Sequence, residues 1–291
     1  MSHAPILSER SHVHAADGLR LERYRWRPPA DAPTPGGPPR LLLVHGLGEH
    51  LGRYEHVGAW WARRGWEVVG VDFRGFGRSD GRRACIRRWS DYHLDLDAVA
   101  PGAPFALLAH SMGGLVALDW LRRRQLAAGT ALPEVALFSG PLLGMHFRPP
   151  WWKELPAPVL SRLLPCLRLP SGLDTQGLCN DRDAVERFES DPLRVAVVTP
   201  RWYEEMKRAL RRVRDFVPEY RVPAQFHLGG DDRTVSRHAV RETAKRWPVQ
   251  AELWEWDRGA HEVLQEPFWE EVLEVMARAV TDGIRDDSRA A

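Results

Sequence analysis

The stretch Phe105-Ala-Leu-Leu-Ala-His-Ser-Met-Gly-Gly-Leu-Val-Ala-Leu118 decides how this chain folds. Its first five residues form a short apolar run, which predicts a buried strand. The run 115–126 is typical of a helix and follows almost without a loop. Ser111 lies in the turn between them, next to the small residues Gly113 and Gly114. The stretch therefore predicts a tight strand-to-helix turn at the carboxyl edge of a sheet.

A serine held in such a turn is typical of a nucleophile elbow, which exposes the side-chain oxygen at the edge of the sheet. The following helix points free backbone N–H groups at any negative charge that develops beside Ser111. The usual motif is Gly-x-Ser-x-Gly, and this chain has Ala109 at the first position. The same pentapeptide also fits a turn that merely joins a strand to a helix, because short motifs often match by accident.

The composition suits one large domain, or a core with an insertion. The chain has 291 residues, of which 44% are hydrophobic, and its net charge of +2 gives no reason to expect a nucleic-acid partner. No run of about 18 apolar residues predicts a membrane span, and residues 1–10 do not resemble a signal peptide. The three cysteines, Cys85, Cys166 and Cys179, are few and odd in number. This count argues against a disulfide framework and predicts a reducing, cytoplasmic compartment.

The residues before the elbow predict a hairpin and two strands. Asp17-Gly18 separates two alternating runs, which predicts a hairpin over 11–26. Apolar runs predict buried strands at 40–44 and 67–72, and the intervening residues 53–64 have the pattern of a helix. The hairpin places His12 and His14 on one face, where we expect them to be solvated.

Each of these two strands runs into a glycine-rich loop. The first loop is His45-Gly-Leu-Gly-Glu-His50, and the second is Asp72-Phe-Arg-Gly-Phe-Gly-Arg-Ser-Asp-Gly81. We interpret His45 and His50 as residues that shape the first loop through local hydrogen bonds, rather than as catalytic bases. Asp72 is expected to order the second loop, whose spacing does not fit a phosphate-binding motif.

The character of the chain changes after a strand predicted at 134–138. Residues 142–170 are rich in Pro, Leu and Trp and fit no regular strand, and residues 171–217 are charged and helical. We interpret 142–220 as a cap inserted into a core made of 1–141 and 221–291. Its apolar part is expected to line an acyl or other hydrophobic pocket or to contact a lipid surface transiently. Alternatively, the aromatic residues only pack the cap onto the core.

The remaining chain alternates strands and helices. Strands are predicted at 224–228 and 251–256, helices at 236–247 and 267–280, and a frayed tail from 281. A turn with adjacent Asp231 and Asp232 follows the first of these strands. His261 follows the second strand, and no second histidine stands four residues later, so we expect no metal site.

Together these motifs resemble the monoacylglycerol lipase and lysophospholipase group of α/β-hydrolases, whose bacterial members are often labelled serine aminopeptidase-like. The resemblance extends from about residue 40 to the C-terminal helix, and it rests on several motifs that occur in the right order and spacing. It implies an α/β-hydrolase fold, with a mostly parallel central sheet, helices on both faces and an inserted cap. The connection 89–102 is shorter than in that group, a difference expected to affect packing more than chemistry.

The resemblance also implies the roles of site residues. Ser111 would be the nucleophile and His261 the base, and the pattern Gly-x-x-Asp-x-x-Val favours Asp232 over Asp231 as the acid. The backbone N–H groups of Leu47 and Met112 would form the oxyanion hole. In the cap, the adjacent aromatic residues at 151 and 152 would bind substrate; these are Trp151 and Trp152.

The function implied is a serine hydrolase that cleaves carboxylic esters through an acyl-enzyme. The expected substrates are monoacylglycerols, lysophospholipids or small esters, with no cofactor, no metal and no obligate protein partner. An acyltransferase or a thioesterase could use the same triad, and a ligand-binding member of the fold is a further alternative. A peptidase is disfavoured because nothing marks a site for a free amino terminus, and a dehalogenase would need Asp in place of Ser111.

Overall fold

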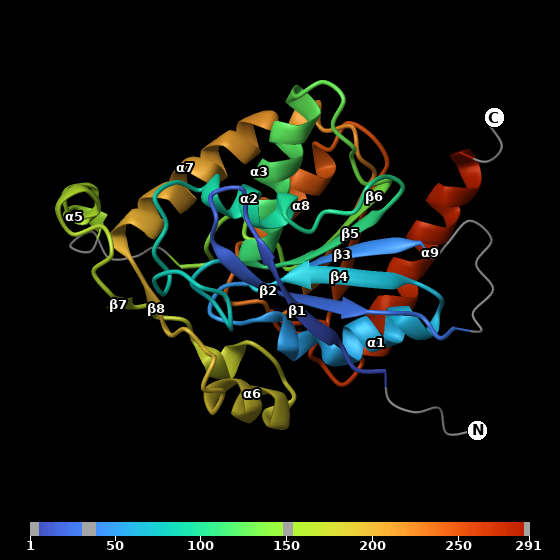
Figure 1. Cartoon of the computed structure of the whole chain (residues 1–291), viewed down its shortest axis with the longest axis horizontal. Helices are drawn as coiled ribbons and strands as arrows, with labels where there is room; N and C mark the ends of the chain where they lie inside the picture. The colour runs from blue at the N-terminus through green and yellow to red at the C-terminus, as the bar shows by residue number, and fades with distance from the viewer. Residues whose placement is uncertain (1–5, 31–38, 148–153, 288–291) are drawn as a thin grey trace.

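The computed structural model describes residues 6–30, 39–147 and 154–287, and within them eight strands form one sheet (Figure 1). The strand order is β1-β2-β4-β3-β5-β6-β9-β10. The first two strands are antiparallel to their neighbours and all others are parallel. The strands are β1 Glu9–His14, β2 Arg20–Trp26, β3 Arg40–Val44, β4 Glu67–Val71, β5 Ala106–His110, β6 Val135–Ser139, β9 Ala224–Gly229 and β10 Ala251–Trp256. This sheet confirms the predicted mostly parallel α/β architecture.

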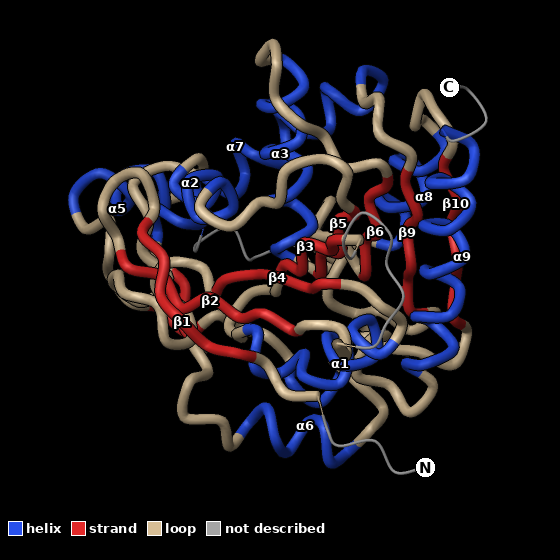
Figure 2. The backbone as a smooth tube through the Cα atoms, turned by 45° about the vertical axis from the view of Figure 1, so that its right-hand side comes forward, coloured by secondary structure: helices blue, strands red, loops and turns tan. Residues whose placement is uncertain are grey.

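Helices cover both faces of the sheet, which is why its central strands are apolar throughout (Figure 2). Alternate residues of β3 belong to different cores. Leu41 and Leu43 pack with residues of α1 (Glu55–Arg63) and α9 (Trp269–Asp287). Leu42 and Val44 pack with residues of the helices on the other face, which are α2 (Asp91–Asp97), α3 (Met112–Leu126), α7 (Pro200–Phe216) and α8 (Arg237–Lys245).

Two predicted boundaries differ from the structure. The helix predicted over 53–64 begins as a short 3-10 helix, η1 (Leu51–Tyr54), before it continues as α1. The tail predicted as frayed from Thr281 is instead part of α9, which extends to Asp287.

Residues 142–220 connect the neighbouring strands β6 and β9. They contain two short strands that pair with each other, β7 and β8, although no regular strand was predicted in 142–170. Two-residue strands are too short to leave a period in the sequence. The elements are α5 Ala157–Leu163, β7 Leu169–Pro170, η2 Thr175–Gly177, α6 Arg182–Glu189, β8 Val197–Val198, α7 and η3 Val217–Glu219.

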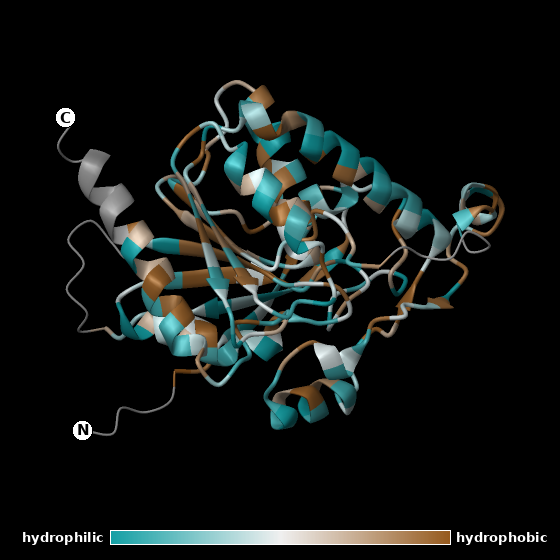
Figure 3. Ribbon diagram, turned by 180° about the vertical axis from the view of Figure 1, so that it is seen from behind, coloured by the Kyte–Doolittle hydropathy of each residue, from teal (hydrophilic) through white to brown (hydrophobic). Residues whose placement is uncertain are grey.

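Within this insertion, α7 packs against α3 and α5, and α5 lies at the periphery of the molecule (Figures 1 and 3). Helix α7 begins with a capped turn, because Thr199 Oγ1 accepts a hydrogen bond from the N–H of Trp202 at 3.3 Å and Pro200 fits the first helical position. The region around α5 exposes apolar side chains, and both Leu155 and Leu163 have more than 70% of their surface exposed. We propose that residues 142–220 form a cap on a core made of residues 1–141 and 221–291.

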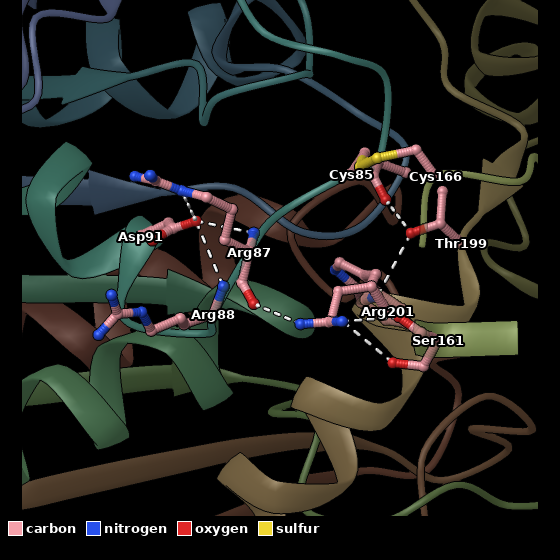
Figure 4. Close-up of a disulfide and its surroundings, with 10 residues drawn as sticks. Cys85, Arg87, Arg88, Asp91, Ser161, Cys166, Thr199 and Arg201 are labelled. Atoms are coloured by element: carbon pink, nitrogen blue, oxygen red, sulfur yellow. Dashed lines mark hydrogen bonds and ion pairs between the residues drawn. A yellow bond between two sulfur atoms is a disulfide. The ribbon is translucent and has the colours of Figure 1, made fainter. Parts of the chain in front are cut away.

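A disulfide between Cys85 and Cys166 joins the insertion to the loop that follows β4 (Figure 4). The two Cα atoms are 5.3 Å apart, although the residues are separated by 81 positions in the sequence. Beside it, Thr199 Oγ1 donates a hydrogen bond of 2.8 Å to the carbonyl oxygen of Ala84. Cys179 is free and buried.

The cysteine count argued against a disulfide framework, and it did not reveal the single bond between Cys85 and Cys166. A count of cysteines carries no information on which of them the fold brings together. The cytoplasmic location rested on the same count and stays a prediction. Within the described residues, no helix is long and apolar enough to cross a membrane.

Candidate active site

Ser111 lies between β5 and α3 in a strained backbone conformation. Its φ is +50° and its ψ is −119°, a region that residues with a Cβ rarely adopt. The turn has no room for larger neighbours, because a Cβ on Gly113 would lie 2.3 Å from the carbonyl oxygen of His45. A Cβ on Gly114 would lie 2.7 Å from the Cβ of Pro141. The structure therefore has the tight strand-to-helix turn that the sequence predicted.

His261 links Ser111 to Asp232. Its Nε2 lies 2.9 Å from Ser111 Oγ, and its Nδ1 lies 2.8 Å from Asp232 Oδ2. Asp232 and His261 follow β9 and β10, two strands parallel to β5, so all three residues meet at one edge of the sheet. All three are buried, and Ser111 is the most exposed at 8%.

The position of Asp232 is fixed by its second oxygen. Oδ1 accepts hydrogen bonds from the N–H groups of Thr234 and Val235, at 2.8 and 2.9 Å. Asp231, the alternative considered from the sequence, is exposed and pairs with Arg233 at 2.8 Å. The geometry therefore places Asp232, and not its neighbour, against His261.

The charges around His261 favour its protonated form. Burial by itself lowers the pKa of the imidazole, but the charge and hydrogen bond of Asp232 raise it, with a further contribution from Glu262. The net effect raises the pKa of His261 above 6.5. For Asp232, burial opposes the charged form, but the interactions with His261 outweigh it and lower the pKa of the carboxyl. The pair is thus arranged to stabilise an imidazolium beside Ser111.

The loop 45–50 lies next to the serine turn and holds the predicted donor Leu47. Its shape is fixed by Glu49, whose Oε1 accepts the N–H of Gly46 at 2.5 Å, and by Gly48, which has a φ of +80°. The N–H of Leu47 donates to no protein atom in the part of the chain that the structure describes. Met112 opens α3, and N–H groups of a first turn have no partner inside their helix.

The two histidines of this loop differ in their partners. His45 makes the expected local contact, because Nδ1 lies 2.8 Å from the carbonyl oxygen of Gly46, and its Nε2 also accepts the N–H of Phe73 in the second glycine-rich loop at 2.9 Å. His50 likewise makes a local bond, since its Nδ1 accepts the N–H of Gly52 at 3.1 Å. Its Nε2 lies 2.7 Å from Asp191 Oδ2, a partner 141 positions away in the insertion that the sequence did not predict. Such a contact depends on the tertiary fold and leaves no motif.

Asp72 orders the second glycine-rich loop, as predicted. Its Oδ1 accepts the N–H of Leu51 at 2.8 Å, and its Oδ2 accepts the N–H of Arg78 at 2.9 Å. The carboxylate therefore joins the loop after β4 to the start of η1, which follows the loop with Leu47.

A buried charge network that includes the neighbour of His261 was not found from the sequence. Arg53 pairs with Glu262, the neighbour of His261, at 2.8 Å, and also with Glu49 at 2.5 Å. Tyr54 donates its hydroxyl to Glu49 Oε1 at 2.8 Å. The motif Glu49-His-Leu-Gly-Arg-Tyr54 contained three of these residues, but nothing in it identified the distant Glu262.

Other features lie apart from the triad or outside the described residues. Trp151 and Trp152, the predicted substrate-binding residues, lie outside the described ranges. Among the described residues, no cluster of His, Cys, Asp and Glu could hold a metal ion. A groove of about 830 Å³ lies between the β1–β2 hairpin and residues 77–83, and none of the three triad candidates lines it.

Comparison with known proteins gives a consistent relationship. The family model described as "Serine aminopeptidase, S33" matches residues 39–268. The phospholipase YtpA of Bacillus subtilis is 30% identical over 83% of this chain and 94% of its own length. Human monoglyceride lipase is 31% identical over 87% of this chain and 83% of its own length.

A solved structure supports the same fold. The monoacylglycerol lipase of Paleococcus ferrophilus superposes with a TM-score of 0.80, at 24% identity, over 90% of this chain and 99% of that one. At this identity the likeness concerns the fold alone. The fold of this chain thus has a counterpart among solved structures.

Proposed function

The chain belongs to the serine aminopeptidase S33 family, in the monoacylglycerol lipase-like group of α/β-hydrolases, and on this premise we propose that it hydrolyses monoacylglycerols or lysophospholipids through Ser111, His261 and Asp232. Its relatives identify it more generally as a carboxylic ester hydrolase. The observation that carries the proposal is the continuous chain of short contacts from Ser111 Oγ through the His261 ring to Asp232.

In the proposed first step, Ser111 attacks the carbonyl carbon of the ester. A serine hydroxyl is a weak nucleophile near neutral pH and needs a base within hydrogen-bond reach. His261 Nε2 accepts the Ser111 proton as the new C–O bond forms, and it then gives this proton to the leaving alcohol. Asp232 holds the other ring proton on Nδ1 and stabilises the imidazolium. The products of this step are an acyl-enzyme and the free alcohol.

Water completes the reaction by the same route. His261 takes a proton from the water, the hydroxyl attacks the acyl carbon, and the proton returns to Ser111 as the fatty acid leaves. In both steps the carbonyl oxygen gains negative charge. We assign the stabilisation of this charge to the N–H groups of Leu47 and Met112. The loss of one such donor typically raises the activation barrier by about 2.7–4 kcal/mol.

We further propose that the region around α5 contacts lipid surfaces transiently. The large apolar side chains exposed here are too many to be scattered singly, and a cluster of this kind is typical of a lipid- or ligand-contacting face. Burial of this face in a lipid surface would bring the insertion to the substrate. The residues are Leu155, Val159, Leu163, Leu164, Leu167 and Leu169.

The substrate proposal is tested with two lipids that share one acyl chain. The protein and its Ser111→Ala variant are incubated with 1-oleoylglycerol or 1-oleoyl-lysophosphatidylcholine, with and without a large excess of glycerol, and the products are identified by mass spectrometry. We expect oleic acid from at least one lipid and none with Ser111→Ala. Transfer of oleoyl from the lysophosphatidylcholine to glycerol, giving oleoylglycerol and glycerophosphocholine without free acid, would identify an acyltransferase instead. Both lipids unchanged would contradict the proposal.

A further inference from the structure

We propose that Asp191, a residue of the insertion, is a positioning residue that holds the loop 45–50 in the geometry required for oxyanion stabilisation. It acts through His50 and does not touch the substrate. This inference rests on the proposed function, because it assigns Leu47 to the oxyanion hole. It adds that the hole is completed by the insertion, not by the core alone.

The contact between Asp191 and His50 is short and protected. The two side chains have 19% and 9% of their surfaces exposed, and the distance from Nε2 to Oδ2 is 2.7 Å. A hydrogen bond with a charged partner and this degree of shielding is stronger than one in water. Asp191 is itself oriented, because its other oxygen, Oδ1, accepts the N–H of Leu193 at 2.7 Å.

The second nitrogen of His50 determines which tautomer is present. Nδ1 accepts the backbone N–H of Gly52 at 3.1 Å, as the cap of η1. An Nδ1 that accepts a hydrogen bond carries no proton, so in the neutral ring the proton is on Nε2 and points to Asp191. The imidazole therefore spans two fixed groups, the start of η1 on one side and the insertion on the other.

A backbone contact beside it reinforces the connection. The N–H of Val195 donates to the carbonyl oxygen of Gly48 at 2.9 Å, and Val195 is buried. A Cβ on Gly48 would lie 2.9 Å from the carbonyl oxygen of Val195, so the two backbones pass very close to each other. The segment 191–195 thus holds the loop at two points, on either side of Glu49.

Leu47 precedes Gly48 directly, and its N–H has no protein partner in the described part of the chain that would fix its direction. Its direction is therefore set by the bonds on its neighbours. Glu49 fixes the loop on one side through the N–H of Gly46, and Asp191 fixes it on the other side through His50. Loss of the bond between Asp191 and His50 should displace the N–H of Leu47 without removing it. The resulting fall in kcat should be smaller than the 10²–10³-fold fall that follows deletion of an oxyanion donor.

The test compares kcat and KM for p-nitrophenyl acetate, together with the affinity for a boronic acid that mimics the tetrahedral intermediate. Two variants break the same bond from opposite sides. Asp191→Ala removes the acceptor, and His50→Asn keeps an acceptor for the Gly52 N–H but is too short to reach Asp191. We expect each to lower kcat and the boronate affinity by about tenfold, with KM for this short ester unchanged.

The double variant distinguishes a shared role from two separate ones. If Asp191 acts through His50, Asp191→Ala combined with His50→Asn should lose no more than either change alone. A loss near the product of the two would overturn the proposal, as would wild-type kcat in His50→Asn, which remains a test even if Asp191→Ala does not fold. Asp191→Asn should recover part of the activity, because its amide oxygen can accept the His50 proton.

A control variant lies in the same insertion. Asp181 caps α6 by accepting the N–H of Asp183 at 2.9 Å. Asp181→Ala should lower the melting temperature and leave kcat unchanged. If it lowered kcat as much as Asp191→Ala, general loosening of the insertion would explain both, and the proposal would fail. Ser111→Ala with full activity would refute the proposed function itself, which is a different outcome from normal kcat in Asp191→Ala.

Discussion

Replacement of Arg53 by methionine should strongly destabilise the protein at neutral pH. Arg53 is buried between two carboxylates, with 9% of its side chain exposed, and it pairs with Glu49 and Glu262. Methionine has a similar length and no charge, so it preserves much of the packing under the Phe188 ring, which lies 4.3 Å from the guanidinium carbon. The change therefore removes mainly the compensating positive charge.

The magnitude follows from the charge that remains. Removing one partner of a buried ion pair typically costs about 3–5 kcal/mol, because the other charge is left uncompensated. The pKa of Glu49 points in the same direction: burial raises it, but the charge of Arg53 and other neighbouring groups outweigh burial and lower it.

The effect should depend on pH with a definite sign. A carboxyl whose pKa is lowered by folding adds stability above its unfolded pKa, and this stability is lost as the pH falls through the folded value. The destabilisation by Arg53→Met should therefore be largest near neutral pH. It should shrink between the values of 4.5 and about 2 that bound the titration of Glu49.

The assay is urea denaturation of the wild type and two variants at pH 7. Arg241→Met is the matched control, because Arg241 pairs with Glu255 at 2.6 Å but has 45% of its side chain exposed. Exposed pairs contribute about 0–1 kcal/mol, so we expect little change in the control. A fall of less than about 1 kcal/mol in the free energy of unfolding of Arg53→Met, which is the size expected for the control, would show that Arg53 does not act as a compensating charge.

Three further outcomes are expected. Asp232→Asn should lower kcat by about 10⁴-fold. It should also move the rising limb of the pH profile of kcat/KM to lower pH, because the carboxylate that raises the pKa of His261 is lost. A rising limb that does not move between pH 5 and 9 would refute this role of Asp232. Replacing Cys85 and Cys166 by serine should lower the free energy of unfolding by up to about 4.5 kcal/mol, since they close a loop of 81 positions, and an unchanged urea midpoint would count against it. Burial lowers the pKa of His227 to about 3, so the unfolded state gains a proton first and the free energy of unfolding should fall as the pH drops below about 6.5. Urea titrations should show a weaker fall with pH in His227→Gln, and an equal fall in both proteins would show that another group causes the pH dependence.

The parts of the fold that the sequence predicted well are those set by local patterns. The strands predicted at 40–44 and 251–256 have those bounds in β3 and β10. The serine turn was also predictable, because a residue with positive φ between a strand and a helix requires small neighbours such as Gly113.

The side-chain contacts that were missed at the candidate site join residues far apart in the sequence. Arg53 and Glu262 are 209 positions apart, and His50 and Asp191 are 141 apart. Neither pair has a spacing that a sequence pattern could reveal, because the fold alone brings the residues together. The same holds for the disulfide between Cys85 and Cys166, which a count of cysteines could not reveal.

The central claim is that Ser111 is the nucleophile activated by His261. The most direct test is the rate of p-nitrophenyl butyrate hydrolysis by Ser111→Ala, with circular dichroism to show that the variant is folded. The account predicts that kcat falls by about 10⁶-fold, as expected when the nucleophile of a triad is removed. A folded Ser111→Ala that retained a hundredth or more of wild-type kcat would contradict it.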